Sequence, residues 1–492
     1  MTQTPSPAAP SSAALAPRDR TVILILLIAT FVVILNETIM NVALPRLMTD
    51  LRVSTGTVQW LSTAFLLTMA VVIPVTGFLL QRFSTRTVFF LAMGLFCAGT
   101  LLAGLAPGFP LLLLARVVQA SGTAVMLPLL ITTVLTLVPP AGRGGVMGTV
   151  SIVISVAPAI GPTLSGLILQ TLSWRFMFLF VLPIALAALA YGARALRNVG
   201  DQQRLSLDIL SVPLSAVGFG GLVYALSEAS GPGGLGAPGV VWPLVASVVA
   251  LLTFGWRQLA LGRRGTPLLD LRVFGYPMFA LGVSLMMIAM IALFGGLILL
   301  PLYLQNIRGL NALQTGLLLL PGGLLMGLLA PSVGKLFDRY GPRWLVTPGT
   351  LLLSLVLWQL GGITSTTPIW TLLTLHMVLS VGLALLFTPV FASALSPLPP
   401  HLYSHGSAAL STMQQVAGAA GTALLITIMT GRAGTLIRGG ALPELAQQGG
   451  LQLAFTVAAG ISVLAVVLAL FMQRPAQQDQ GAGEQPSASV SA

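Results

Sequence analysis

The chain has 492 residues, of which 56% are hydrophobic and only 7% charged, and its formal net charge is +12. Such a composition excludes an ordinary soluble globular protein and indicates a membrane protein. The positive charge does not indicate a nucleic-acid partner, because the basic residues stand singly or in pairs in short loops. A single cysteine and three scattered histidines give no disulfide and no recognisable metal motif, so no cofactor is expected.

The apolar stretches predict fourteen transmembrane helices, because a bilayer core takes about 20 apolar residues as a helix. In chain order, the first six are expected near residues 21–45, 58–80, 87–106, 110–138, 144–170 and 174–194. Two follow near 208–228 and 240–261, and the last six near 277–304, 314–335, 344–363, 368–390, 406–430 and 451–473. The predicted fold class is therefore an all-α integral membrane protein.

An internal repeat relates the two halves of the chain. Residues 77–86 align with residues 334–343 at an offset of about 260 residues, and near that offset Arg116 meets His376 and Gly161 meets Gly421. Parallel repeats of this kind, related by an axis along the membrane normal, are typical of secondary transporters. We therefore expect two homologous six-helix bundles with two helices inserted between them.

The expected domain organisation follows from the repeat and from composition. The Pro/Ala/Ser-rich amino terminus and the polar carboxyl-terminal tail are expected to be disordered. In order, the segments are a tail at 1–20, a bundle at 21–194, a linker with the two extra helices at 195–272, a bundle at 273–473 and a tail at 474–492.

The distribution of basic residues predicts the orientation. Most of the 23 Lys and Arg residues fall in loops that share one side with both termini, which places that side in the cytoplasm. Arg far outnumbers Lys, as is typical of GC-rich bacterial genomes. We expect a multi-pass protein of a bacterial cytoplasmic (inner) membrane.

Two charged residues lie deep inside predicted helices. Glu37 is the only one of the 11 acids in such a position, where a charge costs about 3 kcal/mol or more. Since a carboxyl group can take up and release a proton, Glu37 is a candidate proton carrier. Arg116 must find a partner, and Gln119 and Gly122 share its helical face. The alternatives are a hydrogen-bonded acid that holds helices together and a snorkelling arginine that fixes helix position.

Two loops repeat a pattern of small and basic residues. The second copy carries Gly334, Asp338, Arg339, Gly341 and Arg343, and the first carries Gly77, Arg82 and Arg86. In the first copy Gln81 replaces the acid and Ser84 replaces the second glycine. The pattern resembles the loop between helices two and three of the major facilitator superfamily. That resemblance implies a conformational latch, with the charged form in doubt for the first copy.

Three further segments resemble the fourteen-span drug:H+ antiporters of that superfamily, in the lincomycin-resistance-like multidrug efflux branch. The stretch LNETIMNVALP places Glu37 where the family carries an acid, usually Asp, and Arg116, Gln119 and Gly122 resemble its R-x-x-Q-G pattern. The fifth span resembles the antiporter motif at Pro158, Gly161, Pro162 and Gly166.

The resemblance implies the major facilitator fold and a proton-coupled exporter of amphipathic, often cationic drugs, working by alternating access. Glu37 and Arg116 are then the expected proton-coupling residues, and His376 is either a third or a hydrogen-bond partner between helices. The chain is expected to be monomeric and not an enzyme, with drugs, protons and the lipid bilayer as its partners. An exporter of an endogenous amphiphile (a lipid, antibiotic or siderophore) and a membrane sensor remain alternatives. Candidate substrate contacts are Asn41, Trp60, Gln119, Tyr303, Gln305, Gln414 and Gln415.

Overall fold

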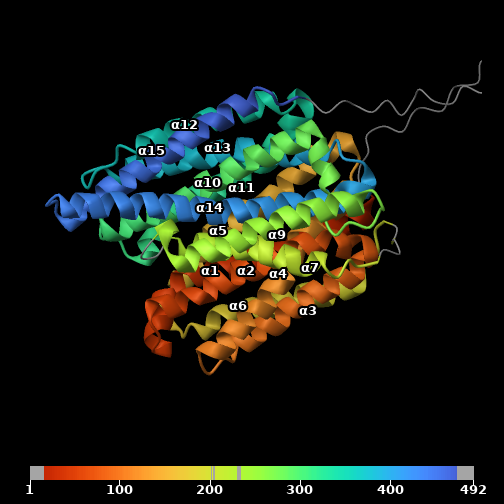
Figure 1. Cartoon of the computed structure of the whole chain (residues 1–492), viewed down its shortest axis with the longest axis horizontal. Coiled ribbons are helices and arrows are strands. Elements are labelled where there is room, and N and C mark those ends of the chain that lie inside the picture. Colours follow the sequence, from red (N-terminus) through yellow and green to blue (C-terminus); the bar gives the residue numbers. More distant parts are fainter. Residues whose placement is uncertain (1–15, 201, 203–205, 230–233, 474–492) are drawn as a thin grey trace, which may run out of the picture.

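The computed structural model describes residues 16–200, 202, 206–229 and 234–473, and in these residues every regular element is a helix. Twelve of the helices are long and apolar enough to cross a membrane, and they run roughly along one common direction (Figure 1). The expected disorder of residues 1–15 and 474–492 concerns segments outside the described residues. The first helix begins at Pro17, before the predicted residue 21, with a proline in its first turn and Asp19 near its positive end.

The first six long helices form the amino-terminal bundle. Their short connections follow local capping, since Ser54 and Ser84 each accept a hydrogen bond from a backbone N–H of the helix that they precede. The helices are α1 (Pro17–Leu51), α2 (Thr55–Arg82), α3 (Thr85–Gly104), α4 (Phe109–Leu137), α5 (Arg143–Thr171) and α6 (Arg175–Ala195), with a 3-10 turn at Pro140–Gly142.

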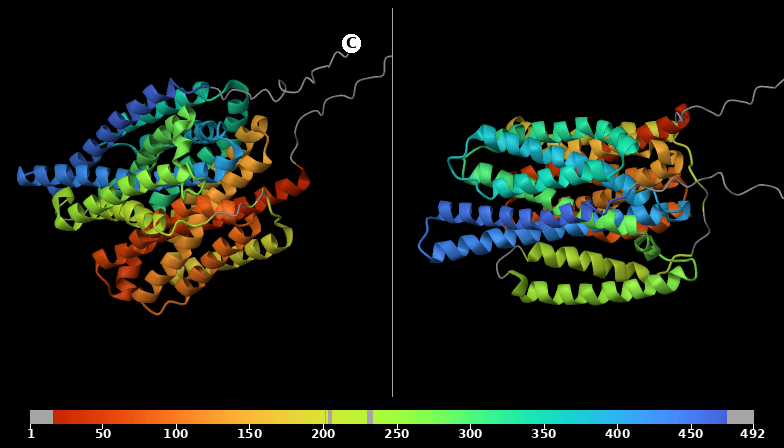
Figure 2. Two further views of the ribbon diagram at one scale, coloured as in Figure 1. Left: turned by 45° about the vertical axis from the view of Figure 1, so that its right-hand side comes forward. Right: turned by 90° about the horizontal axis from the view of Figure 1, so that it is seen from above.

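An inserted helix pair follows. Its first arm is a run of α7 (Ser211–Ser215), a π-helical turn η2 (Ala216–Gly220) and α8 (Gly221–Glu228), and its second arm is α9 (Pro238–Gly262). The Ser247 hydroxyl of α9 donates to the carbonyl oxygen of Gly218 over 2.6 Å, which ties the arms together at the π-helical turn. Figure 2 shows the pair, in yellow and green, as a layer at the edge of the molecule.

The second long bundle begins after a 3-10 turn at Leu271–Gly275. It comprises α10 (Pro277–Asn306), α11 (Ala312–Tyr340), α12 (Arg343–Leu360), α13 (Ile369–Leu395), α14 (Tyr403–Arg438) and α15 (Pro443–Ala469), with a 3-10 turn at Pro400–Leu402 before α14. Two predicted spans are not among the twelve long apolar helices: they fall on α12 and on the α7–η2–α8 run, which are helical but short. The count of fourteen spans therefore stays a prediction.

The two ends of the helical layer are distinct. Helix α1 begins and α15 ends on the same side of the molecule (Figure 1). We call this side the terminus end and the other side the distal end. The terminus end also holds the connections α2–α3, α4–α5, α11–α12 and α13–α14.

Helices α5 and α11 of the two bundles pack backbone against backbone. A Cβ added to Gly148 would overlap the carbonyl oxygen of Ala330, and one added to Gly323 would overlap the Cβ of Ala159. Apolar side chains are solvated by lipid, so close approach at small residues is what holds helices together in a bilayer. The α5–α11 interface is therefore a main connection between the bundles.

We expect Gly148→Ala to lower the free energy of unfolding by about 1–3 kcal/mol, because the new methyl group forces the α5 and α11 backbones apart. Thermal unfolding of the purified protein in detergent measures this as a lower Tm. The matched control is Gly94→Ala in α3, where an added Cβ meets nothing within 4 Å. Equal Tm values for the two variants would contradict the close packing.

Candidate functional site

The Arg116 side chain lies at the centre of the amino-terminal bundle and is 1% exposed. Its Nη1 donates to Gln119 Oε1 over 2.6 Å and to Asn36 Oδ1 over 3.4 Å, and its Nε donates to the carbonyl oxygen of Leu61 over 3.5 Å. The guanidinium lies over the ring of Phe65, 4.0 Å from its centroid. Partners from α1 and α2 thus hold this α4 side chain inside the bundle. It does not extend toward the membrane surface, as a snorkelling arginine would.

The hydrogen bonding continues from Arg116 into α3. The Gln119 Nε2 donates to Thr100 Oγ1 over 2.8 Å, and this hydroxyl donates to the carbonyl oxygen of Phe96 over 2.6 Å. A Cβ added to Gly122 would overlap the backbone of α3, so the two helices are in direct contact there. We call Arg116, Gln119, Asn36, Phe65 and Thr100 the Arg116 cluster. Because Arg116, Gln119 and Thr100 are joined in one chain of hydrogen bonds, the cluster fixes the position of the positive charge.

Glu37 follows Asn36 directly and lies half-buried in α1. Arg116 is the charged side chain that acts electrostatically on its carboxyl group. Among the described side chains none forms a hydrogen bond or an ion pair with Glu37. Asn41, predicted to contact substrate, lies one turn further along α1, but its side chain is outside the described part. The carboxyl group thus has a nearby positive charge without being locked to it.

Helix α5 touches α1 one residue after Glu37. The Thr38 Oγ1 lies 3.5 Å from the carbonyl oxygen of Ala157, and a Cβ added to Gly161 would overlap that hydroxyl. Pro158 and Pro162, which remove backbone donors, flank this contact inside α5. The fourth residue of the predicted motif, Gly166, lies beside Leu313 of α11 at ordinary contact distance. The motif thus packs on both α1 and α11.

The predicted latch of the second half contacts the first half at the terminus end. The Asp338 carboxylate accepts hydrogen bonds from the backbone N–H groups of Gly144 (3.0 Å) and Gly145 (3.1 Å), at the start of α5. A negative charge at a helix amino terminus is favourable for the helix dipole. Gly334 lies against the Gly144 backbone, and Gly341 ends α11 with a φ of +82°, which favours glycine. The contact between the end of α11 and the start of α5 therefore includes Asp338 and Gly334, with Gly341 directly after them.

The arginines of the second copy lie outside this contact. Arg339 and Arg343 are exposed, and Arg339 lies over the ring of Tyr340, 5.2 Å from its centroid. In the first copy, Arg86 donates to the carbonyl oxygen of Ala193 at the end of α6 over 2.6 Å, and Arg82 is exposed.

The first copy of the latch makes a neutral contact with the second bundle. The Gln81 Nε2 donates to the carbonyl oxygen of His401 over 2.8 Å, just before α14. Gly77 allows α14 to approach, since its added Cβ would lie 2.8 Å from His405 Nδ1. Ser84 replaces the second glycine and caps α3 with a φ of −65°, so this turn requires no left-handed residue. The first copy thus makes its contact through an uncharged amide, and α2 and α14 still approach each other closely, as α5 and α11 do at the second copy.

Two further contacts across the bundles at the terminus end were not predicted from the sequence. The Arg143 Nη2 donates to the Tyr403 hydroxyl over 2.8 Å, and the hydroxyls of Thr132 and Ser407 lie 2.7 Å apart. The sequence carried no signal for either pairing, because Arg143 stands in an expected loop and the burial of its side chain is seen only in the structure. Together with the contacts of Asp338 and Gln81, these bonds join the two bundles at the terminus end. They lie between α5 and α11 and between the first bundle and the start of α14.

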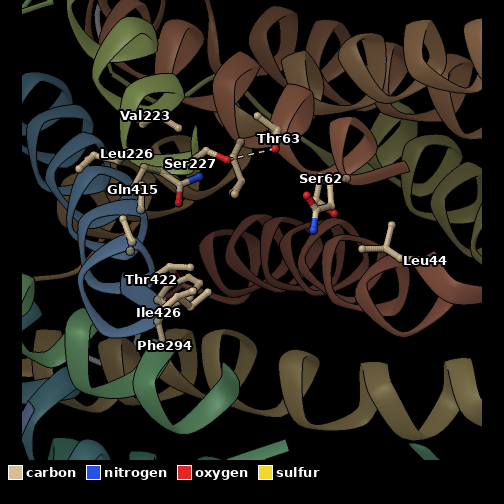
Figure 3. Close-up of a pocket in the computed structure, with 15 residues that line it drawn as sticks. Leu44, Ser62, Thr63, Val223, Leu226, Ser227, Phe294, Gln415, Thr422 and Ile426 are labelled. Carbon is tan, nitrogen blue, oxygen red and sulfur yellow. Dashed lines mark hydrogen bonds between the residues drawn. The ribbon is translucent and has the colours of Figure 1, made fainter. Parts of the chain in front are cut away.

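At the distal end the bundles enclose a pocket with about 940 Å³ of space not filled by atoms, part of it open to solvent. Figure 3 shows side chains from α1, α2, α8, α10 and α14 around it. The lining residues are uncharged: Leu44, Gln59, Ser62, Thr63, Leu66, Val223, Leu226, Ser227, Phe294, Gln415, Gly418, Ala419, Thr422, Ala423 and Ile426. Of the predicted substrate contacts, Gln415 lines this pocket.

The other predicted substrate contacts are dispersed. Trp60 is 37% exposed and pairs with Tyr224, their ring centroids 6.0 Å apart. The buried Tyr303 donates its hydroxyl to the carbonyl oxygen of Thr364 over 2.6 Å. Gln305 is exposed, Gln414 is buried, and Gln119 belongs to the Arg116 cluster. Selection by residue type therefore did not locate one site.

His376 lies in a second, more apolar pocket between α5, α10, α11 and α13. Its Nε2 lies 3.0 Å from the carbonyl oxygen of Leu319, and its Nδ1 has no hydrogen-bond partner among the described residues. The lining includes Pro158 and Pro162 of the α5 motif. His376 shares no described hydrogen bond with the Arg116 cluster, so the structure keeps the two repeat-related residues in separate environments.

Two bundles joined at one end, a pocket between them at the other end and a buried ionisable cluster together define a multi-pass membrane transporter. A family model described as Major Facilitator Superfamily matches residues 26–422, and the chain belongs to that superfamily. It is accordingly a transporter and not an enzyme, as predicted.

Two bacterial relatives extend this assignment. The chain is 41% identical to "Lincomycin resistance protein LmrB" of Bacillus subtilis (strain 168), over 91% of this chain and 95% of that protein. It is 44% identical to the protein of the same name from Listeria innocua, over 82% of this chain and 85% of that protein. The predicted resemblance to the lincomycin-resistance branch is thus confirmed, as is the link to antibiotic resistance proteins.

A solved structure supports the fold. The crystal structure of the human organic anion transporter MFSD10 superimposes with a TM-score of 0.62 at 17% identity, covering 92% of this chain and 100% of that chain. At that level of identity the likeness concerns the fold alone. The all-helical major facilitator fold is therefore confirmed.

We expect Arg116→Lys to reduce transport at least tenfold. An ammonium group cannot reproduce the guanidinium bonds to Gln119 and Asn36 while lying over Phe65. Uptake of a fluorescent drug into inside-out vesicles measures the effect. The control is Arg194→Lys at an exposed position at the end of α6, which should transport normally. Full activity of Arg116→Lys would show that the fixed guanidinium is dispensable.

We expect Asp338→Asn to open the terminus end more often, because the start of α5 loses its negative charge. Such a charge–dipole interaction is worth about 0.3–2 kcal/mol. In a Cys97→Ala background, Ser404→Cys reports opening, since Ser404 is buried at this end of α14. Maleimide labelling should accelerate at least about twofold.

The control for this experiment is Asp50→Asn, an exposed residue at the distal end of α1. It removes the same charge without touching the terminus end, so its labelling rate should equal that of the parent protein. If Asp338→Asn also leaves the rate unchanged, Asp338 does not hold this end closed.

Proposed function

We propose that the chain is a fourteen-span, proton-coupled antiporter that exports amphipathic small molecules, often cationic ones, by alternating access. The observation that carries the proposal is the placement of Glu37. This half-buried carboxyl group lies in mid-α1, under the electrostatic influence of a fixed Arg116 and without a described bond of its own. An ionisable group in such a position is suited to exchange a proton during a transport cycle.

The proposal assigns the terminus end to the cytoplasm of a bacterial cell. The positive-inside distribution supports this orientation, and the relatives reported above are bacterial. The span count of fourteen requires α12 and the α7–η2–α8 run to cross the membrane as short helices. A monomer suffices, because the Arg116 cluster, the latch contacts and the distal pocket are all built within one chain.

In this orientation the structure is closed to the cytoplasm and carries its pocket toward the outside. The proposed cycle has two coupled events. When the site faces the cytoplasm, Glu37 releases its proton and the drug binds. When the site faces outward, a proton from outside binds Glu37 and the drug leaves. The proton gradient drives export as long as proton binding to Glu37 and drug binding disfavour one another.

The names of the relatives supply the substrate side of the proposal. Proteins of 41% and 44% identity are called lincomycin resistance proteins, so export of antibiotics is the activity to test first. A panel of antibiotics and synthetic amphiphiles, each assayed in inside-out vesicles with and without a pH gradient, gives the spectrum.

We expect Glu37→Gln to abolish pH-gradient-driven accumulation of drug in inside-out vesicles, because the amide cannot carry a proton. Drug movement down its own gradient should persist, since the substitution preserves shape and hydrogen-bonding capacity. The comparison of the two assays separates lost coupling from lost folding.

Two controls accompany Glu37→Gln. Glu444→Gln, at an exposed position in the first turn of α15, should retain full coupled export. Glu37→Asp keeps a carboxyl group and should retain part of the activity. Full gradient-driven export by Glu37→Gln would refute the role of Glu37 as proton carrier.

A further inference from the structure

The distal pocket has a wall that belongs to neither bundle. The inserted helix α8 contributes Val223, Leu226 and Ser227 to its lining. In Figure 3 Ser227 lies close to Thr63 of α2, and their hydroxyl oxygens are 3.2 Å apart. The inserted pair is therefore part of the pocket and not only an outer layer.

Helix α8 bridges the two bundles at this point. On one side it meets α2 through Ser227 and Thr63, and on the other side the Thr427 hydroxyl of α14 donates to the carbonyl oxygen of Ala229 over 3.3 Å. Helix α9 supports it from behind, because Gly218 and Gly221 bring the arm close to Leu251 and Ser247. A helix held in this way gives the pocket a defined third side.

The chemistry of the lining selects a class of ligand. Its polar groups are amides and hydroxyls, as in Gln59, Gln415, Thr422 and Ser227, and the described residues that line it include no ionisable side chain. Desolvation of a charged group is costly where no countercharge is present. Amides and hydroxyls instead satisfy uncharged donors and acceptors of a ligand, and the apolar lining covers its hydrocarbon part.

We propose that the pocket is the outward substrate site, that it takes uncharged amphiphiles carrying hydroxyl or amide groups, and that Ser227 of the inserted pair is one of its specificity-determining residues. This rests on the proposed export function and departs from it in one respect, since the substrates of this site are neutral and not cationic. It also gives the inserted pair a role: α8 completes a site that the two bundles leave open between α2 and α14.

The test uses two probes of matched shape: a dansyl amide with a hydroxyalkyl chain, and the same molecule with a primary ammonium group, cationic at neutral pH, in place of the hydroxyl. Binding to the purified protein is followed by dansyl fluorescence. We expect the neutral probe to bind at least about tenfold more tightly than the cationic one. Ser227→Ala should weaken binding of the neutral probe about two- to tenfold, the value of one hydrogen bond.

A second variant fills the pocket, and a third serves as control. Ser227→Trp should abolish binding of the neutral probe by occupying the space beside Gln415 and Thr422. Thr253→Val removes a hydroxyl from the exposed face of α9, where Thr253 bonds its own helix, and should bind like the parent protein. Ser227→Ala keeps the test decisive if the tryptophan variant does not fold.

The outcomes separate this inference from the proposed function. Equal affinity for the two probes, or unchanged affinity in both Ser227 variants, overturns the assignment of the site. If binding behaves as expected but the parent protein shows no pH-gradient-driven transport in vesicles, the pocket assignment stands and the antiporter proposal fails. If transport is normal and Ser227→Ala leaves the KM for the neutral probe unchanged, the pocket is not on the transport route, and the inference is wrong.

Discussion

In a lipid bilayer, close contact between backbones has to hold helices together, because lipid solvates apolar side chains as well as protein does. Helix α5 meets this constraint on two faces. Gly144 and Gly148 bring it against α11 of the other bundle, and Gly161 brings it against Thr38 of α1. The relative placement of the two bundles and of Glu37 therefore depends on one helix with small residues at fixed positions.

This arrangement connects the predicted latch physically with the half-buried Glu37. The start of α5 carries the hydrogen bonds to Asp338, and its middle contacts the residue after Glu37. Pro158 and Pro162 lie beside that contact and weaken the helix locally, so that α5 is able to bend there. A movement of α5 that breaks the Asp338 bonds would also shift the surroundings of Glu37. Such a shared element would couple the two sites if it adopted two arrangements.

Local rules predicted part of this from the sequence. The spacing of Arg116 and Gln119 predicted a shared face, and the structure joins them by a 2.6 Å bond. The glycine pattern pointed to Gly341, which has the positive φ that such a position demands. These features depend on neighbours within a turn or on a backbone conformation, and both leave a pattern in sequence.

Contacts between distant helices left no such pattern. The bond of Gln81 to the backbone of His401 joins residues 320 positions apart, and neither residue type indicates the pairing. The wall formed by α8 depends on how the inserted pair packs, which hydropathy does not encode. For the same reason, residue type did not group the candidate substrate contacts: Trp60 lies beside Tyr224, with their ring centroids 6.0 Å apart, and Gln305 is exposed, so their contact with substrate stays a prediction.

The two interfaces between the bundles differ in the hydrogen bonds that the predicted latch makes at the terminus end. A carboxylate accepting two backbone N–H bonds closes the α5–α11 side, whereas a neutral amide closes the α2–α14 side, and charge-assisted hydrogen bonds are roughly twice as strong as neutral ones. The α5–α11 interface is also close from Gly144 to Thr163, while α2 and α14 separate around the pocket toward the distal end. The inserted pair covers this weaker side, where α8 contacts both helices. Under the proposed alternating access, a site between α2 and α14 would lie open to lipid when the bundles move apart, and the inserted pair would cover it there.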